Sequence, residues 1–279
     1  MKRPYFSVII PTLNEEKFLP KLLNDLRKQK EGDFEIVVVD GNSKDRTKEV
    51  AGAYNRLFTN FKLLDAKKNN VSYQRNLGAK LSRGTYIIFL DADSRIGSSF
   101  ITKIKSEINK NRFLIFLPAI LPQDKTYQDV VIFNLANFVI EISQTIGKPF
   151  SSGGSMIFQK DFFNFIEGFD DKLFLAEDHE IIQRARKYGV TAKLLRNAKV
   201  KFSLRRMKRE GRLDLFRKYL IASIHSFAKG EIDKKIFDYE MGGANYQFLK
   251  NKQPSIEKTI KNYFRRLKNQ LGQLIEEET

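Results

Sequence analysis

Tyr86-Ile-Ile-Phe-Leu-Asp-Ala-Asp93 is the stretch of this 279-residue chain that decides its fold. Five consecutive apolar or aromatic residues lead into two carboxylates that one alanine separates. A run without polar alternation indicates a strand covered on both faces, as in a parallel sheet with helices above and below it. Open sheets of this kind bind ligands just beyond the carboxyl ends of their strands. Asp91 and Asp93 are thus candidates to hold a hard divalent cation, and an Asp-rich turn is the alternative.

The sequence before this stretch alternates strand and helix patterns. We predict strands at residues 5–10, 36–39 and 61–64, a helix at about 16–28, and a helix that begins near Ser72 and ends at Gly84. Gly78 lies inside the last helix, where either tight packing on the sheet or contact with a substrate would favour glycine. Short connections imply right-handed crossovers and a parallel sheet, which places five residues on one rim: Pro11, Thr12, Asp40, Asp91 and Asp93.

A series of short segments is similar, in the same order, to the motifs of family 2 glycosyltransferases, which have the GT-A fold. Each segment alone is a weak signal, but their common order makes the resemblance specific. The segments are Ser7-Val-Ile-Ile-Pro-Thr-Leu-Asn-Glu-Glu16, Val38-Val-Asp-Gly-Asn-Ser43, Arg75-Asn-Leu-Gly-Ala79, Asp91-Ala-Asp93, Ser152-Gly-Gly-Ser-Met-Ile-Phe158, Gly168-Phe-Asp-Asp171 and Ala176-Glu-Asp-His179.

This resemblance implies an α/β fold with a Rossmann-like, mostly parallel sheet flanked by helices. It implies an inverting glycosyltransferase that uses a divalent cation, Mn²⁺ or Mg²⁺. The implied nucleotide-binding residues are Pro11, Thr12, Asn14, Glu15, Asp40, Arg75, Asp91 and Ala92, and Asp93 with Asp91 would hold the metal. The implied catalytic base is Asp178, with Glu177 beside it, and the implied acceptor or diphosphate loop contains Gly153, Gly154, Arg205 and Arg206.

Two departures from the family pattern limit the assignment. The second nucleotide loop more often reads Asp-Asp-Gly-Ser, whereas Gly41 stands here at the second position. Asp40 alone is therefore left to supply the carboxylate expected to contact the nucleotide base or the ribose. No Gln-x-x-Arg-Trp follows the Glu-Asp motif, and the chain has no tryptophan, which argues against a processive polysaccharide synthase.

The residue types suit transfer of a glycosyl group from a nucleoside diphosphate. A cation at Asp93 would stabilise the charge that develops on the departing diphosphate. Inversion in a single step needs a base for the attacking hydroxyl, and Asp178 at the start of a predicted helix is the candidate. Helix capping is the alternative role of Glu177 and Asp178. We expect His179 on the helix surface; with two histidines and no cysteine, the chain has few ligands for zinc.

A net charge of +17, from 50 Lys and Arg against 33 Asp and Glu, indicates anionic partners. The basic residues are dense at 204–213 and 258–268. The first cluster, with Arg205, Arg206, Lys208 and Arg209, would either clamp a diphosphate or rest on an anionic membrane surface, and a solvated basic face is the alternative. A nucleic-acid partner is not expected, because the aromatic residues lie in core patterns and not beside the basic runs.

A second feature bears on membranes. Residues 129–146 show a helical pattern with a narrow polar stripe of Asn134, Asn137, Glu141 and Gln144 and an apolar arc wider than one sheet face requires. This helix is either sandwiched within the protein or turned to lipid, and it is too short and too polar to span a bilayer.

The chain divides by composition into residues 1–204, with a nucleotide-binding half (1–95) and an acceptor half (96–204), and a helical, basic appendage (205–279). The appendage would dock on the domain, form a homodimer through its last helix, or lie on a membrane. Met1-Lys-Arg-Pro4 runs straight into the first strand without the apolar region of a secretion signal, and cysteine is absent. We therefore expect a cytoplasmic enzyme, either free or peripheral at the inner membrane face.

Three classes of function follow from these observations. The leading one is transfer of a sugar from a nucleotide sugar, with UDP as the expected nucleotide, to a glycan or lipid-linked acceptor. The second is a nucleotidyltransferase of similar fold. This reading lacks support, because the chain has no Gly-rich loop of that enzyme class after the first strand and Glu177-Asp178 would have no obvious role in it. The third, a basic protein that binds nucleic acid or membrane, rests on charge alone.

Overall fold

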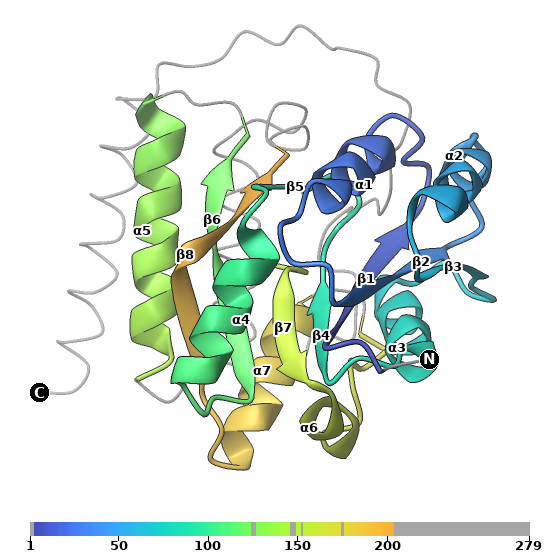
Figure 1. Ribbon diagram of the computed structural model, residues 1–279. Coiled ribbons are helices and arrows are strands. Elements are labelled where there is room, and N and C mark those ends of the chain that lie inside the picture. The colour runs from blue at the N-terminus through green and yellow to red at the C-terminus, as the bar shows by residue number, and fades with distance from the viewer. Residues whose placement is uncertain (1–2, 124–126, 146–148, 152, 174–175, 204–279) are drawn as a thin grey trace, which may run out of the picture. The chain divides into compact units, whose positions relative to one another are not determined.

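The computed structural model describes residues 3–123, 127–145, 149–151, 153–173 and 176–203 (Figure 1). Within them, eight strands form one sheet in the order β3-β2-β1-β4-β7-β6-β8-β5. Their bounds are β1 (Phe6–Thr12), β2 (Phe34–Asp40), β3 (Phe61–Asp65), β4 (Tyr86–Phe89), β5 (Arg95–Ile96), β6 (Ile115–Pro122), β7 (Met156–Gln159) and β8 (Ala192–Phe202).

The sheet is mixed. Strands β3, β2, β1 and β4 are parallel to one another, as predicted for the nucleotide-binding half. Strand β7 runs antiparallel to both β4 and β6, β8 is parallel to β6, and β5 closes the edge antiparallel to β8. Strands β5 to β8 thus extend the parallel half through an antiparallel strand, and the predicted α/β architecture with flanking helices is confirmed.

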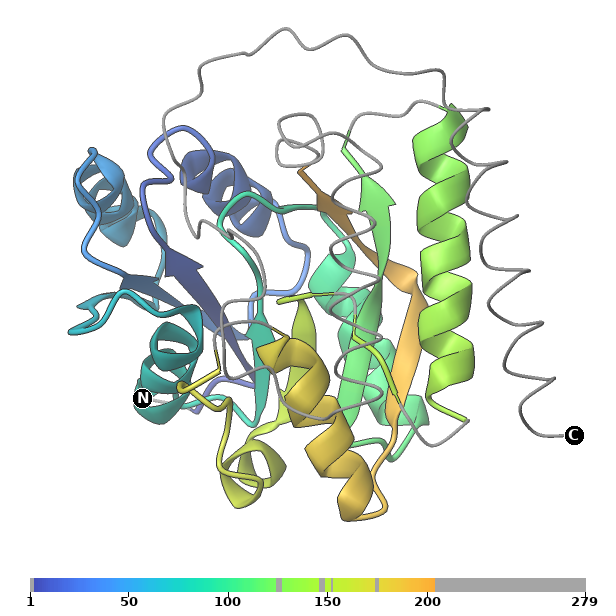
Figure 2. The same cartoon turned by 180° about the vertical axis from the view of Figure 1, so that it is seen from behind.

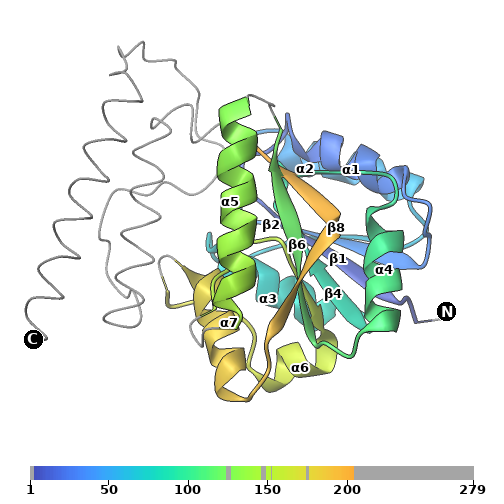
Figure 3. The same cartoon turned by 90° about the vertical axis from the view of Figure 1, so that its left-hand side faces the viewer.

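Helices cover both faces of this sheet (Figure 3). Helices α1 (Leu19–Arg27), α2 (Thr47–Ala53) and α4 (Phe100–Lys110) contribute to one core, and the short 3-10 helix η1 (Tyr54–Leu57) follows α2. Helices α3 (Val71–Leu81), α5 (Tyr127–Ser143), α6 (Lys160–Phe165) and α7 (Glu177–Lys187) contribute to the other core, on the face seen in Figure 2.

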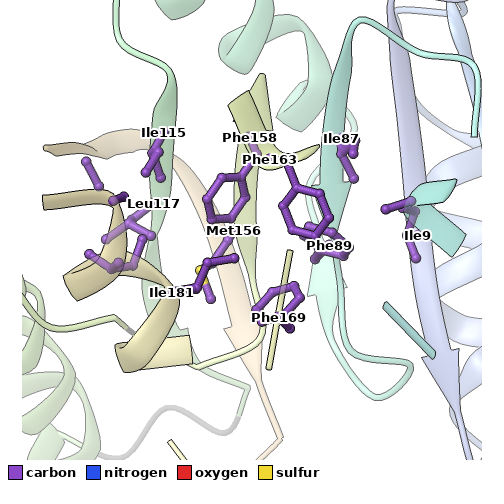
Figure 4. Packing of buried hydrophobic residues seen from close by; sticks show 14 of the residues in the cluster. Ile9, Ile87, Phe89, Ile115, Leu117, Met156, Phe158, Phe163, Phe169 and Ile181 are labelled. Atoms are coloured by element: carbon purple, nitrogen blue, oxygen red, sulfur yellow. The ribbon is translucent and has the colours of Figure 1, made fainter. Parts of the chain in front are cut away.

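Alternation along the strands explains why there are two cores. In β4, Ile87 and Phe89 pack in the core of α3 and α7, while Ile88 packs in the core of α1 and α4. Figure 4 shows the first of these cores, where Phe89 lies among aromatic rings from β7, α6 and the loop that follows α6. An unbroken apolar run is therefore what a strand buried on both faces requires.

Strand β1 continues through Pro11 and Thr12, two residues that we expected in the following loop. The pairing of β1 with β4 stops at Ile9 and Phe89, and the N–H of Leu90 donates to the Ile9 carbonyl. The nitrogen of Pro11, two residues further on, faces the same side, where the pairing with β4 has ended. Proline is tolerated there because no ladder hydrogen bond is lost.

Helix α3 differs from its prediction in two ways. Its cap is Asn70, whose side chain accepts a hydrogen bond from the Tyr73 N–H at 2.8 Å, and not Ser72. The helix ends at Leu81 and not at Gly84, which leaves Leu81 43 % exposed. Gly78 is explained by packing, since a Cβ at this position would lie 2.5 Å from Cγ2 of Ile9 in β1.

Helix α5 lies along β6. Asn137 from the predicted polar stripe pairs with the backbone of Ile120, accepting from its N–H and donating to its carbonyl, both at 2.9 Å. Asn137 therefore serves the sheet, whereas Asn134 from the same stripe is exposed. In the described part of the chain, the opposite side exposes a set of apolar side chains at helical spacing: Leu135, Phe138, Val139 and Ile142.

The predicted division at residue 204 falls at the end of the described residues, and residues 205–279 lie outside them, so this division stays a prediction. None of the helices in the described ranges combines the length and apolar character that a membrane-spanning helix needs.

Candidate active site

Three parallel strands bring the predicted rim together. Thr12 and Asp40 end β1 and β2 as register partners, and Asp91-Ala92-Asp93 follows β4 on the other side of β1. Pro11 and Ala92 are buried in this rim, while Asp91 is partly exposed. The carboxyl ends of the strands thus form the ligand-binding edge that the topology predicts.

The loops after β1 and β2 are tied to each other. Asp40 is fully buried, and its carboxylate accepts hydrogen bonds from the Ser43 N–H at 2.9 Å and the Ser43 hydroxyl at 2.5 Å. Asn14, in the left-handed region with φ 54°, accepts from the Lys44 N–H, and the N–H of Glu15 donates to the Thr47 hydroxyl. These residues therefore hold the loops after β1 and β2 in one fixed arrangement.

Gln74 occupies the space that Gly41 leaves open. Its side-chain amide donates to the carbonyls of Thr12 at 2.9 Å and Val39 at 2.7 Å, which joins the ends of β1 and β2. A Cβ on Gly41 would lie 3.0 Å from this amide, so a larger side chain would require the amide to move. The glycine that departs from the family pattern thus has a local structural partner.

Arg75 connects the two sides of the site. Its guanidinium donates through Nη2 to Asp91 Oδ1 at 3.0 Å and through Nη1 to Glu177 Oε1 at 2.9 Å. The side chain is 3 % exposed, whereas Asp91 is 31 % and Glu177 is 12 % exposed. One arginine on α3 thereby fixes a carboxylate after β4 and a carboxylate at the start of α7.

Gly154 lies against this ion-pair network. A Cβ there would meet Arg75 Nη2 at 1.9 Å and Asp91 Oδ1 at 2.5 Å, so only glycine leaves the network in place. The neighbouring Gly153 has φ +94°, a conformation that other residues rarely adopt. The predicted loop at 153–154 therefore approaches Asp91 and the Arg75 guanidinium directly.

An aromatic cluster supports Arg75 from the core. Its guanidinium carbon lies 5.2 Å from the ring centroid of Phe169, which contacts Phe89 edge-on with centroids 5.2 Å apart (Figure 4). Asn76, the next residue on α3, donates to the Phe169 carbonyl at 2.7 Å and accepts from its N–H at 2.9 Å. The Gly168-Phe-Asp-Asp171 segment is thus held by the residue that follows the arginine.

Burial and charge set the protonation of this network. Burial raises the pKa of Glu177 above its ordinary value, and the nearby Asp178 raises it further, although Arg75 acts in the opposite direction. Burial alone would lower the pKa of Arg75, but Asp91 and Glu177 raise it. Arg75 is therefore a permanent cation between two carboxylates, of which Glu177 is the one that burial pushes toward its neutral form.

Asp178 and His179 lie in the first turn of α7. Asp178 is largely buried, and its Oδ2 lies 3.6 Å from Nδ1 of His179. The expectation that His179 lies on the helix surface is wrong: its side chain is 12 % exposed because it packs against Phe150 and accepts from the Ser151 N–H. Helical periodicity alone does not reveal a covering loop that comes from elsewhere in the chain.

The residues after β4 suit a cation that arrives with a phosphate ligand. Asp91 and Asp93 supply carboxylate oxygens, which are the ligands that hard divalent cations prefer. In the described ranges, no group of three or more histidines or acidic residues is placed to hold a metal by itself. A cation that takes its other ligands from a diphosphate and water needs only one or two carboxylates, so the donor set fits.

The structure thus brings most of the predicted residues to one edge of the sheet. Arg205 and Arg206 lie outside the described residues. Sequence reasoning did not single out Gln74, Asn76, Phe169 or Ser43, although Asn76, Phe169 and Ser43 stand inside the quoted motifs. Each makes its contact with the backbone or side chain of a distant segment, which a linear motif does not show.

Comparison with known proteins agrees with the geometry. The chain is 31 % identical over 109 residues to the uncharacterized glycosyltransferase EpsJ of Bacillus subtilis, covering 39 % of this chain and 32 % of that protein. The crystal structure of Staphylococcus aureus TarS 1-349 in complex with UDP-GlcNAc has a TM-score of 0.55 at 22 % identity, covering 71 % of this chain and 58 % of that one.

The mannosyltransferase PcManGT of Pyrobaculum calidifontis, solved with GDP-Man and Mn²⁺, has a TM-score of 0.64 at 16 % identity and covers 81 % of this chain and 65 % of that one. The chain thus spans less than two thirds of each of these proteins. The sequence model of Glycosyl transferase family 2 matches residues 7–166, which is more than half of the chain. The chain therefore belongs to glycosyl transferase family 2, and its fold is the GT-A fold of these structural neighbours.

Proposed function

We propose that this enzyme transfers a sugar from a nucleotide sugar, with UDP as the nucleotide, to a hydroxyl of a glycan or lipid-linked acceptor with inversion at the anomeric carbon. The observation that carries the proposal is the Arg75 bridge between Asp91 and Glu177. It holds the predicted donor-side carboxylate and the predicted acceptor-side acids on opposite sides of one guanidinium. A single displacement at an anomeric carbon needs these two functions on two sides of the sugar.

On the acceptor side, Asp178 takes the proton of the attacking hydroxyl as the new bond to the anomeric carbon forms and the bond to the diphosphate breaks. Glu177 has a different role, because it is paired with Arg75 and its pKa is raised by burial. It holds the Arg75 guanidinium in place.

On the donor side, Asp93 with Asp91 would hold a divalent cation, which when bound acts as a Lewis acid toward the departing diphosphate. Thr12, Asn14 and Glu15 would line the nucleoside end of the same edge. Asp40 fixes their loop through Ser43, whose hydroxyl accepts from the Asn14 N–H and donates to the Asp40 carboxylate. Association with an anionic membrane surface, and a homodimer formed through the last predicted helix, remain part of the proposal and rest on the sequence.

The test separates binding from chemistry. A panel of nucleotide sugars with Mn²⁺ identifies the donor through release of the nucleoside diphosphate. Asp178→Asn should leave nucleotide affinity unchanged and lower turnover by about two to four orders of magnitude, the usual contribution of a positioned base. The matched control is Asp161→Asn, which removes an exposed acid from the first turn of α6 and should leave turnover unchanged. Substantial turnover in Asp178→Asn would contradict the assignment of the base.

A further inference from the structure

His179 makes a contact that links α7 to the loop before β7. Its Nδ1 accepts a hydrogen bond from the Ser151 N–H at 3.2 Å, and its ring contacts Phe150 edge-on with centroids 5.5 Å apart. The same Nδ1 lies 3.6 Å from Oδ2 of Asp178. One nitrogen thus faces both a backbone donor of the loop and the carboxylate proposed as base.

The direction of the hydrogen bond fixes the tautomer. A ring nitrogen that accepts carries no proton, so the neutral His179 ring has its proton on Nε2. At 3.6 Å the contact with Asp178 is too long for a hydrogen bond. A proton on Nδ1 would turn this atom into a donor, which can no longer accept from Ser151 and which faces Asp178 as a cation.

The loop that His179 contacts is anchored at its other end. The N–H of Phe150 donates to the Ser143 hydroxyl at 2.9 Å, and Gln144 donates to the Phe150 carbonyl at 2.8 Å. Beyond Ser151, the chain leads to Gly154, which packs on Arg75 and Asp91. The bond between Ser151 and His179 therefore fastens Phe150 and Ser151 to the start of α7.

The charged groups around this contact are already assigned to partners. On α7, Glu177 is paired with Arg75 and Glu180 with Arg184. The loop residues 149–151 and 153–155 carry no ionisable side chain. Asp178 is thus the carboxylate that faces Nδ1 and that would pair with the protonated His179 ring.

We propose that His179 is a positioning residue with two states. In its neutral state it fastens the acceptor-side loop through Ser151 and leaves Asp178 available as base. In its protonated state it exchanges the Ser151 bond for an ion pair with Asp178, which releases the loop and weakens the base. A falling pH favours the protonated state of a histidine, so transfer would slow as the pH falls. This inference rests on the proposed function for the role of Asp178.

The first experiment needs no substrate. The chain has two histidines, so ¹⁵N-edited NMR of the imidazole rings gives two sets of signals, and His225→Gln assigns them. We expect the Nε2–H tautomer for His179 at pH 8, and a Ser151 amide signal that moves with the same midpoint as the His179 ring. An Nδ1–H tautomer, or a Ser151 amide that does not follow the ring, would overturn the proposal.

The second experiment uses two variants. His179→Asn places a carbonyl oxygen near the position of Nδ1, so it keeps the acceptor without titrating, whereas His179→Leu removes it. For hydrolysis of the donor that the panel above selects, His179→Asn should keep the rate of the wild type at pH 8 and lose the decline toward pH 5. His179→Leu should be slower at pH 8 by about fivefold, which corresponds to one net hydrogen bond.

An unchanged acid decline in His179→Asn, or a wild-type rate in His179→Leu, would contradict the two-state role. If the panel selects no donor, the proposed function fails, and the NMR titration still decides the behaviour of His179 on its own.

Discussion

Replacement of Gly154 by alanine is the sharpest test of the Arg75 network. The added Cβ would lie 1.9 Å from Arg75 Nη2, 2.9 Å from Arg75 Cζ and 2.5 Å from Asp91 Oδ1. The arginine has little room to yield, because it is 3 % exposed and held at both ends by carboxylates. The substitution therefore has to separate Arg75 from Asp91 or displace the loop.

Two physical effects set the expected loss in the free energy of unfolding. Overpacking a buried position costs about 1–3 kcal/mol. Breaking a buried ion pair by removing one partner costs about 3–5 kcal/mol, and displacement with partial relaxation costs less. We therefore expect Gly154→Ala to lower the free energy of unfolding by about 2–4 kcal/mol, and to weaken Mn²⁺-dependent binding of UDP because Asp91 moves.

Urea denaturation followed by circular dichroism measures the first effect, and calorimetry with UDP and Mn²⁺ measures the second. Gly52→Ala in α2 is the control without a steric conflict, because nothing lies within 4 Å of its Cβ position, and it should be neutral or stabilising by up to about 1 kcal/mol. On the background of Arg75→Met, the cost of Gly154→Ala should shrink by at least about 1 kcal/mol, since the two sites couple directly. A wild-type denaturation midpoint for Gly154→Ala would refute the reasoning.

Three further predictions address charge. Asp93→Ala should abolish Mn²⁺-dependent binding of UDP in calorimetry, and an unchanged affinity would exclude Asp93 as the metal ligand. Arg75→Met should raise the pKa of Glu177 further, because the arginine opposes the effect of burial. A raised carboxyl pKa adds stability below the unfolded-state value of about 4.3, and this is lost as the pH rises through the folded-state pKa. Urea denaturation should therefore show a loss of about 3–5 kcal/mol at pH 8 and a smaller one at pH 5. Finally, the wild type should sediment with anionic liposomes at low salt and be released at high salt. A variant with glutamine at residues 205, 206, 208 and 209 should bind far less, since each basic residue near such a surface contributes about 1 kcal/mol. If this variant binds as well as the wild type, the basic cluster is not the membrane contact.

Local pattern was enough to predict the parallel half of the fold. The apolar runs at β1, β2 and β4 identify buried strands, and their short connections fix the rim on which Asp40 and Asp91 lie. The same reasoning did not identify β6, β7 or β8. Strand β7 inserts between β4 and β6 in antiparallel orientation, a pairing between segments far apart in the chain that no local periodicity encodes. In strand β8, basic residues and Asn197 interrupt the apolar residues, so it lacks the unbroken run that marks the other strands.

The candidate site shows the same limit at the level of side chains. Sequence motifs named Arg75 and Glu177 separately, but their contact spans 102 positions and depends on how α3 and α7 pack on one face of the sheet. The expected surface position of His179 was wrong for a related reason, since the loop that covers it arrives from before β7. Residue type predicts which chemistry is present, whereas tertiary packing decides which groups meet.

The Arg75-Asn76-Leu77-Gly78 segment explains why one turn of helix is so constrained in this chain. Arg75 reaches the carboxylates of Asp91 and Glu177, Asn76 holds the backbone of Phe169, and Gly78 allows α3 to touch Ile9 in β1. Because successive helical residues point about 100° apart, one turn can address the loop after β4, the start of α7 and the sheet at once. A change in any of these residues would therefore alter the spacing between the loop after β4 and the start of α7.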